Sequence, residues 1–598
     1  MKKFYAKYEN LIMAAMFILI LMAAVIIRYD LYYDLNDDVM MKDILAGIYT
    51  GSPESRNIQM LYPLSAIISV FYRIIPAVPW YALFLCFCQF FSLFLIAFRS
   101  LRFANKTLSK AVFLLFQMIV IITTMLEHLV FVQYTITSMM PAAAAVFYFL
   151  TAEKTDSVKE ILFSSIPVLI LIFVSFTLRP WMLLLLMPLF CAAGLIKWGQ
   201  EKVVYTKQNF TRYFALFGLV VVMLLIGQAA DWLAHSSAEW RSFTKFFNNR
   251  TELYDFQEIP PYDANANFYR GIGLTEGDVN LLFNYNFGLS DTIDENTMGE
   301  IAVYASQLKK DEVPFRERFI KQFRLYVYNL THIGEYADFP YNALVICGYV
   351  ALFGLGIIYS RLSRMFIIIF LLAFVRSSLW MFILMGERNP PRITHSLYFF
   401  EMVILLALFL TEMAKIIKED DKKHIILNDA QKKVFRFINR TYPPALMVIA
   451  LVVGSGNITG MIKKTDAEFA KREDINRTWI AMQEYCHRHA GNFYFIDVYS
   501  TVNYSEKLFA KNLSRPANYE IMGGWVNKSP LYQKKLDNAF TPGMSMFTAL
   551  VTLDNVYFIN GNVRDIDWLS GYYNEQGVFI DLERVDVIAD ELEVYKLR

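Results

Sequence analysis

The chain has 598 residues, of which 56% are hydrophobic and 16% aromatic, and its formal net charge is +2. A soluble globular protein of this length does not carry so high an apolar fraction, so the composition excludes that class. The nearly balanced charge offers no electrostatic attraction for nucleic acid, and we expect no nucleic-acid partner.

Apolar runs close to or above the length that crosses a bilayer recur from the N-terminus to about residue 458. We predict about eleven transmembrane helices, at residues 11–27, 80–98, 111–130, 133–150, 161–178, 181–196, 213–230, 341–359, 365–385, 395–414 and 442–458. No small-residue cleavage site follows the first run, which we therefore interpret as a retained helix. The expected fold class is a polytopic α-helical membrane protein, with residues 1–458 as its transmembrane module.

Lysine and arginine residues cluster in alternate connections between these spans. The clusters lie at residues 2–7, 99–110, 197–212, 361–364 and 415–440. All of them fall on one side if the N-terminus is cytoplasmic, as the positive-inside rule requires. We therefore predict a multi-pass protein of the plasma membrane. Its extracytoplasmic parts are then residues 28–79, 231–340 and 459–598.

The apolar segment 61–76 tests this count, because an additional crossing there would invert every later loop. It is short, contains Arg73 and has prolines near both ends. We interpret it as an interfacial or re-entrant helix, and the weakly amphipathic segment 41–49 as a second one. The first external loop is therefore expected to lie against the membrane surface.

The two larger external pieces differ in character. Residues 231–340 are polar and rich in tyrosine, with helical patterning at 297–330. Residues 459–598 have the pattern of a small extracytoplasmic α/β domain. The predicted elements of that domain are a helix at 475–489 and strands within 492–500, 554–560 and 592–598.

Acidic residues gather where the chain leaves its first and third spans. Asp34, Asp37 and Asp38 follow the first span, and Glu127 and His128 lie at the outer end of the third. They are either solvated loop charges and helix-end caps, or groups that face a substrate held at the membrane surface. In the second case Glu127 approaches Asp37 and Asp38, forming a paired acidic site that orients a hydroxyl group or binds a cation.

Several arginines face outward, against the usual charge bias. Arg179 ends the fifth span, and Arg388 and Arg392 lie in the proline-stiffened turn GERNPPRITH, which also contains His395. A guanidinium group matches the oxygens of a phosphate and stays charged. These arginines either bind a lipid phosphate or diphosphate, or extend their side chains towards lipid headgroups.

Arg376 lies near the middle of a predicted span, where a charge is costly and normally has a partner or faces a wet cavity. Glu401 lies at a comparable depth in the next span, so the two side chains are placed to pair. The pair either fixes the register of two helices or contributes to a substrate site.

Nucleotide and hydrolase motifs are absent from the sequence: it has no Walker loop, no GxGxxG between a strand and a helix, no HExxH and no GxSxG. We therefore expect no nucleotide cofactor. The segment YCHRHAG has no second ligand pair at zinc spacing, so we predict no metal-ligating residues, although a divalent cation as cofactor stays open.

An acidic pair just outside the first transmembrane helix (NDD, 36–38) and late external arginines (ERNPPRITHSLYFFE, 387–401) occur here together with many spans and a C-terminal α/β domain. In these features the chain resembles the GT-C integral-membrane glycosyltransferases, of the bacterial type that uses polyprenyl-phosphate-linked sugars. The resemblance implies that Asp38 or Asp37 is the catalytic carboxylate and Glu127 a second acidic residue. Of the first two we favour Asp38, although the sequence alone does not separate them. The resemblance also implies that Arg392 binds the donor phosphate.

The expected reaction moves a sugar from a polyprenyl-phosphate-linked donor to a glycan or lipid-linked acceptor, with inversion at the anomeric carbon. The candidate residues are Asp38, Asp37 and Glu127 for catalysis, Arg392, Arg388, Arg376 and Arg179 for the phosphate, and His128, Glu401 and His395 in support. Membrane lipid is a further expected partner. A cell-wall, teichoic-acid or capsule acceptor is favoured, because no acceptor-sequence motif of oligosaccharyltransferases is identified.

Two alternatives stay open. A polysaccharide polymerase or ligase would also need external arginines for a lipid diphosphate. A flippase or transporter of lipid-linked sugars would explain Arg376 and Glu401 better, but it should show internal symmetry, and the sequence contains no internal repeat.

Overall fold

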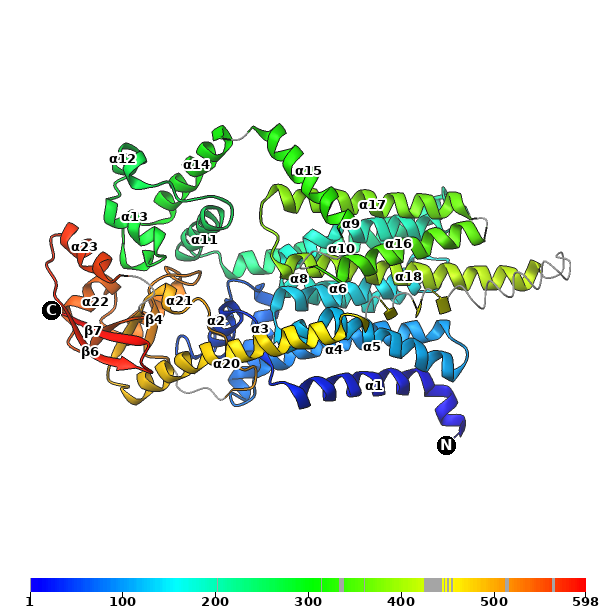
Figure 1. Cartoon of the computed structure of the whole chain (residues 1–598), viewed down its shortest axis with the longest axis horizontal. Helices are drawn as coiled ribbons and strands as arrows, with labels where there is room; N and C mark the ends of the chain where they lie inside the picture. The colour runs from blue at the N-terminus through cyan, green and yellow to red at the C-terminus, as the bar shows by residue number, and fades with distance from the viewer. Residues whose placement is uncertain are drawn as a thin grey trace.

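The computed structural model describes residues 2–201, 203–312, 314–332, 338–359, 361–423, 444–445, 447–448, 451–452, 455–510, 516–561 and 565–598. Long helices run side by side in a bundle, and a smaller α/β part lies at one end of that bundle (Figure 1). Both termini are visible in that view, with the N-terminus at the end of the bundle opposite the α/β part.

Nine helices of the described residues are long and apolar enough to cross a membrane. They are α1 (Lys2–Arg28), α4 (Trp80–Ser100), α5 (Thr107–Val130), α6 (Tyr134–Thr151), α9 (Pro180–Gly199), α10 (Lys207–Ala234), α16 (Tyr341–Ile358), α17 (Leu362–Met385) and α18 (Pro391–Lys423). A tenth span forms if α7 (Val158–Ser164) and α8 (Ile166–Leu178), which meet at a 53° bend, count as one. The chain is thus a polytopic helical membrane protein. The predicted span 442–458 falls largely outside the described residues.

Charged connections are sorted to the two ends of the bundle. At the end near the N-terminus, Lys110 pairs with Glu9 at 2.6 Å and Arg364 with Glu412 at 2.9 Å. These basic residues belong to clusters that the sequence places on one side. Segments 28–79 and 231–340 and the α/β domain gather at the opposite end (Figure 1). The alternation of basic clusters therefore matches the two ends, while the assignment of either end to the cytoplasm stays a prediction.

The first connection contains two short helices, α2 (Asn36–Ala46) and α3 (Tyr62–Ile74). With 13 residues, α3 is too short to cross a bilayer. It buries Leu64 and Ile68 towards the protein and exposes Ile67, Phe71 and Ile74. An apolar outer face on so short a helix agrees with the predicted position at the membrane surface.

The α/β domain is built on a five-stranded sheet with the strand order β4-β3-β5-β7-β6. Its strands are β3 (Phe493–Ile496), β4 (Tyr519–Ile521), β5 (Val556–Asn560), β6 (Leu582–Ile588) and β7 (Leu592–Leu597). β4, β3 and β5 are parallel, and β7 and β6 continue the sheet antiparallel. The predicted strands correspond to β3, β5 and β7. The sequence did not indicate β4, which has three residues, or β6, most of whose residues are exposed.

One face of the sheet shares a hydrophobic core with the long connection between α10 and α16. That connection forms α11 (Ala238–Phe256), α12 (Tyr262–Gly271), α13 (Glu276–Phe283) and α14 (Glu295–Glu312), followed by α15 (Phe315–Thr331). Phe246 and Phe287 pack in one cluster with Phe493, Phe495 and Phe558 of the sheet. The smaller helices α21 (Pro530–Ala539), α22 (Met546–Thr552) and α23 (Asp567–Glu575) complete this layer. Two segments that the sequence separates thus form one folded unit.

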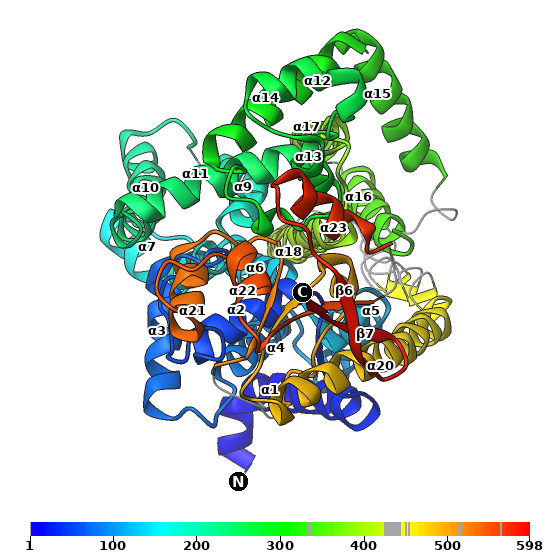
Figure 2. The same cartoon turned by 90° about the vertical axis from the view of Figure 1, so that its left-hand side faces the viewer.

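The opposite face of the sheet packs against α20 (Ile458–Arg488), which connects the domain to the bundle. The predicted helix 475–489 is the second half of this 31-residue helix. The first half packs along α5. Seen from the domain end, α20 passes along one side of the bundle (Figure 2).

Candidate functional site

A short backbone pairing places the start of α2 beside the outer end of α5. β1 (Tyr32–Tyr33) pairs in parallel with β2 (Phe131–Val132), and the Asp34 N–H donates to the Val132 carbonyl at 2.9 Å. The chain then enters α2, whose first turn contains Asp37 and Asp38. Acidic side chains in a first turn are favoured by the free N–H groups and the dipole of the helix.

Asp38 is completely buried. Its Oδ1 accepts hydrogen bonds from the Tyr81 hydroxyl at 2.8 Å and from the Tyr134 backbone N–H at 3.2 Å. Burial, together with the neighbouring charges of Asp37 and Asp34, raises the pKa of Asp38 well above its usual range, although the two hydrogen bonds act against the shift. Through these two hydrogen bonds the buried Asp38 side chain positions α2 against α4 and α6, and its burial leaves it inaccessible to a substrate.

Asp37, the preceding residue, has a different environment. Its side chain is partly exposed, and the structure gives its carboxylate no hydrogen bond or ion pair with any described residue. The charge of Asp37 interacts electrostatically with Asp38 and Tyr134. Of the acidic pair, Asp37 is therefore the carboxylate that is open to a ligand.

Arg179 contacts the same tyrosine from the junction of α8 and α9. Its guanidinium carbon lies 5.0 Å from the centre of the Tyr134 ring, and its Nη1 donates to Gln59 Oε1 at 2.5 Å. Gln59 Oε1 also accepts from the Tyr134 hydroxyl at 3.4 Å. Arg179 thus joins the first external loop to α6, and keeps a positive charge beside the acidic pair.

Arg392 lies in the first turn of α18 and is partly buried. Across the described ranges its guanidinium group has no ion pair and no hydrogen bond. Its charge reaches Asp34 and Tyr134. Asp37, Asp38, Arg179 and Arg392 therefore all act on one side chain, that of Tyr134. The sequence draws attention to the turn that Tyr134 follows, but not to Tyr134 as its centre.

The other predicted phosphate ligands have protein partners. Arg388 forms an ion pair with Asp255 of α11 and lies 6.0 Å from the Phe256 ring, so it ties the turn before α18 to the long connection. Arg376 pairs with Glu401 Oε2 at 2.7 Å, and it donates to Asn342 Oδ1 at the same distance. The predicted pairing of Arg376 with Glu401 is confirmed.

Glu127 pairs with Lys464 of α20 at 2.7 Å. Its charge reaches Asp34. The neighbouring Arg472, also from α20, donates to Asp34 Oδ1 at 2.8 Å and lies 4.3 Å from the Phe131 ring. Burial raises the pKa of Asp34 even though Arg472 opposes the shift. α20 therefore borders the site, a contact that the sequence did not predict.

His128 and His395, the two predicted supporting histidines, meet directly. His128 Nε2 lies 2.8 Å from His395 Nδ1, and the His395 ring stacks on Tyr341 with centroids 4.2 Å apart. His395 Nε2 is 3.5 Å from Asp338 Oδ1. The two histidines join α5, α16 and α18 at the ends nearer the α/β domain, one helical turn after Arg392.

A separate apolar groove lies further along the bundle, and neither the two histidines nor Arg392 is among the residues that line it. It has a volume of about 420 Å³ and lies between α4, α5, α16 and α18. Phe399, Met402 and Leu406 of α18 line the groove. Arg392 and His395 lie on the same stripe of this helix, because each of the five lies three or four residues from the next. Apolar side chains of α5 and α16 form the opposite wall, among them Ile121 and Leu344.

Among the residues that the structure describes, no group of three or more His, Cys, Asp and Glu side chains is arranged to hold a metal ion. Comparisons of this chain with protein-family models, with curated proteins and with solved structures find no match.

Proposed function

We propose that this protein is a membrane glycosyltransferase that uses a polyprenyl-phosphate-linked sugar as donor. The acceptor is a glycan or a lipid-linked molecule of the cell envelope, reached on the outer face of the plasma membrane. The observation that carries the proposal is the stripe of α18. It places Arg392, which has no partner among the described residues, on the same helix face as residues that line an apolar groove. A lipid phosphate has the same two parts, an anionic head and an apolar chain. The resemblance to GT-C glycosyltransferases supports the same conclusion.

In this mechanism Arg392 binds the donor phosphate, and the prenyl chain lies in the groove. The departing polyprenyl phosphate gains negative charge as the glycosidic bond breaks, and a positioned guanidinium stabilises that charge better in the transition state than in the ground state. Arg179 adds a second positive charge beside Tyr134. Arg388 and Arg376 act structurally, because their charges are already paired.

Asp37 is the proposed base. An acceptor hydroxyl becomes an effective nucleophile when a carboxylate within hydrogen-bond distance takes its proton. Asp37 is partly exposed and unpaired among the described residues, whereas Asp38 is buried and held by Tyr81. Direct displacement by one activated hydroxyl inverts the configuration of the anomeric carbon.

The test is complementation of a gene deletion, with analysis of the cell-envelope glycans. Asp37→Asn and Arg392→Gln should each fail to restore the missing glycan while the protein accumulates normally in the membrane. The control variants are Asp30→Asn and Arg73→Gln, which make the same changes at exposed residues of loop 28–79, and these should restore it. Glycans identical with and without the gene, or full complementation by both site variants, would refute the proposal.

Purified protein in liposomes gives the complementary measurement. Candidate polyprenyl-phosphate sugars are supplied as donors, and release of polyprenyl phosphate is followed with and without acceptor. A donor that is flipped across the bilayer but never cleaved would instead support the transporter alternative.

A further inference from the structure

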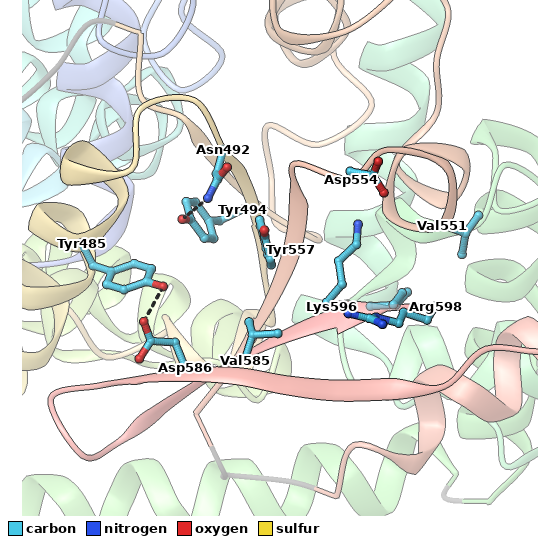
Figure 3. A pocket seen from close by; sticks show the side chains of 11 residues that line it. Tyr485, Asn492, Tyr494, Val551, Asp554, Tyr557, Val585, Asp586, Lys596 and Arg598 are labelled. Carbon is cyan, nitrogen blue, oxygen red and sulfur yellow. Dashed lines mark hydrogen bonds between the residues drawn. The ribbon is translucent and has the colours of Figure 1, made fainter.

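A polar cleft lies on the α/β domain, between the end of α20, the sheet and α22. This domain lies at one end of the molecule, beyond the bundle of long helices (Figure 1). The cleft has a volume of about 600 Å³ and extends across the sheet surface shown in Figure 3. Cavities of this size are typical of small-molecule sites. Nothing in the proposed transfer reaction uses it.

The cleft exists because α20 covers only part of its face of the sheet. Met482 and Cys486 of α20 pack with Ile496, Ile559 and Val594, where the strands lie under the helix. α20 ends at Arg488, and the rest of this face stays open. Tyr494 and Tyr557 are register partners on β3 and β5 in this open part, and Lys596 of β7 lies 5.6 Å from the Tyr557 ring.

Aromatic rings line the floor and one wall. The Tyr494 and Tyr557 rings are stacked with centroids 5.7 Å apart, and Tyr485, from the last turn of α20, meets Tyr494 edge-on at 5.7 Å. Tyr485 and Tyr557 are partly exposed, whereas Tyr494 is buried beneath them. Figure 3 shows the three side chains in sequence along the cleft, with Lys596 beyond Tyr557.

Hydrogen-bonding groups surround these rings. The Tyr485 hydroxyl donates to Asp586 Oδ2 at 2.9 Å, and Asn492 Nδ2 donates to the Tyr494 hydroxyl at 3.2 Å. The Tyr557 hydroxyl and the Asp554 carboxylate have no hydrogen bond to any described part of the chain. The cleft therefore combines flat rings with acceptors and donors that are not all occupied.

The cations at the cleft are occupied, which disfavours an anionic ligand. Lys596 Nζ donates to the carbonyls of Leu553 at 2.5 Å and Val556 at 3.3 Å, and Arg598 pairs with Glu583 at 2.6 Å. Asp554 and Asp586 further offset these two positive charges. A phosphate polymer would meet carboxylates rather than free cations.

We propose that this cleft binds an uncharged segment of a glycan, by stacking sugar rings on Tyr485 and Tyr557 and by hydrogen bonding their hydroxyl groups to Asp554, Asp586 and Asn492. Tyrosine suits such a ligand, because it has an apolar face and a polar edge. Carboxylates accept hydrogen bonds from hydroxyl groups more strongly than neutral acceptors do. The cleft is a second site that holds a polymer near the protein and takes no part in transfer.

The test uses the full-length protein in lipid nanodiscs and saturation-transfer NMR. The probes are maltohexaose, a hexamer of N-acetylglucosamine and a hexamer of glycerol phosphate. We expect at least one of the two neutral hexamers to bind. Tyr557→Ala should weaken that binding roughly tenfold or more, as removal of an anchoring aromatic side chain does. Tyr205→Ala is the matched control, because Tyr205 is an exposed tyrosine far from the cleft, 94% accessible, and binding should be unchanged.

Asp554→Ala is the second variant, chosen because its exposed side chain has no hydrogen bond in the described structure, so the fold does not depend on it. It should also weaken the binding of the neutral hexamer. Three results would overturn the proposal: no neutral hexamer binds, only the glycerol-phosphate hexamer binds, or neither cleft variant changes binding. Asp37→Asn should bind the hexamer normally, so failure of the cleft and failure of the transferase proposal are distinguishable.

Discussion

Arg376 and Arg392 lie on adjacent helices, and each carries a charge into or near the membrane. The guanidinium of Arg376 is closed off by Glu401 and Asn342, both at 2.7 Å. That of Arg392 has no such partner in the described structure, and it lies on the same face of α18 as residues that line an apolar groove. The free-energy cost of placing a charged side chain in or near a bilayer marks both residues as unusual. The presence of a protein partner separates a structural charge from one that is available to a ligand.

The largest effect, a loss of stability, is expected from breaking the ion pair between Arg376 and Glu401. Arg376→Met leaves Glu401 buried without its cation, and should lower the free energy of unfolding by about 3–5 kcal/mol, the usual cost of an uncompensated buried charge. Thermal unfolding of the detergent-solubilised protein measures the change. The double variant Arg376→Met/Glu401→Gln should recover most of the stability. If Arg376→Met alone unfolds like the wild type, the ion pair does not hold these helices together.

Removing the charge of Arg392 should lower activity strongly and leave stability almost unchanged. Arg392→Gln is expected to lower turnover of a polyprenyl-phosphate donor by about 10²–10³-fold, the typical cost of one transition-state donor. Its unfolding free energy should change by no more than about 0.5 kcal/mol, since no described contact is lost. Arg392→Lys should retain part of the activity, because it keeps the charge but loses the planar fork. A strongly destabilised Arg392→Gln protein would contradict the contrast with Arg376.

Of the two arginines, the sequence alone predicted the pairing of Arg376. The apolar runs had to be helices, because a bilayer leaves no other way to satisfy the backbone, and counting along two antiparallel helices placed Arg376 beside Glu401. The pairing of Arg388 with Asp255 and of Glu127 with Lys464 could not be predicted, because each joins segments more than a hundred residues apart. The burial of Asp38 beneath Tyr81 depends in the same way on packing between helices.

Asp37 and Asp38 repeat the contrast within a single helical turn, because the side chain of Asp37 is partly exposed and that of Asp38 is buried. The pKa of Asp38 is raised in the folded protein, whereas an unfolded aspartate titrates near 3.9. Above that pH the unfolded chain binds fewer protons than the folded one, so the Asp38 carboxyl makes the protein progressively less stable as pH rises towards its folded pKa. Asp38→Asn keeps an acceptor for Tyr81 and removes this ionisation.

We therefore expect Asp38→Asn to be within about 1 kcal/mol of the wild type at pH 5 and to gain relative stability as pH rises. Thermal unfolding at several pH values measures this difference. A wild-type protein that becomes more stable than Asp38→Asn with rising pH would show that Asp38 is ionised in the fold.

The smallest effect is expected at Glu127, where a predicted catalytic group has a partner at the protein surface. The Lys464 side chain is 55% exposed, and such pairs are worth about 0.2–1 kcal/mol. Glu127→Gln should therefore change both unfolding and turnover only slightly, and Lys464→Gln should match it because both variants break the same contact. If Glu127→Gln abolishes turnover while Lys464→Gln does not, Glu127 acts on the substrate, and a partner would then not be enough to mark a charge as structural.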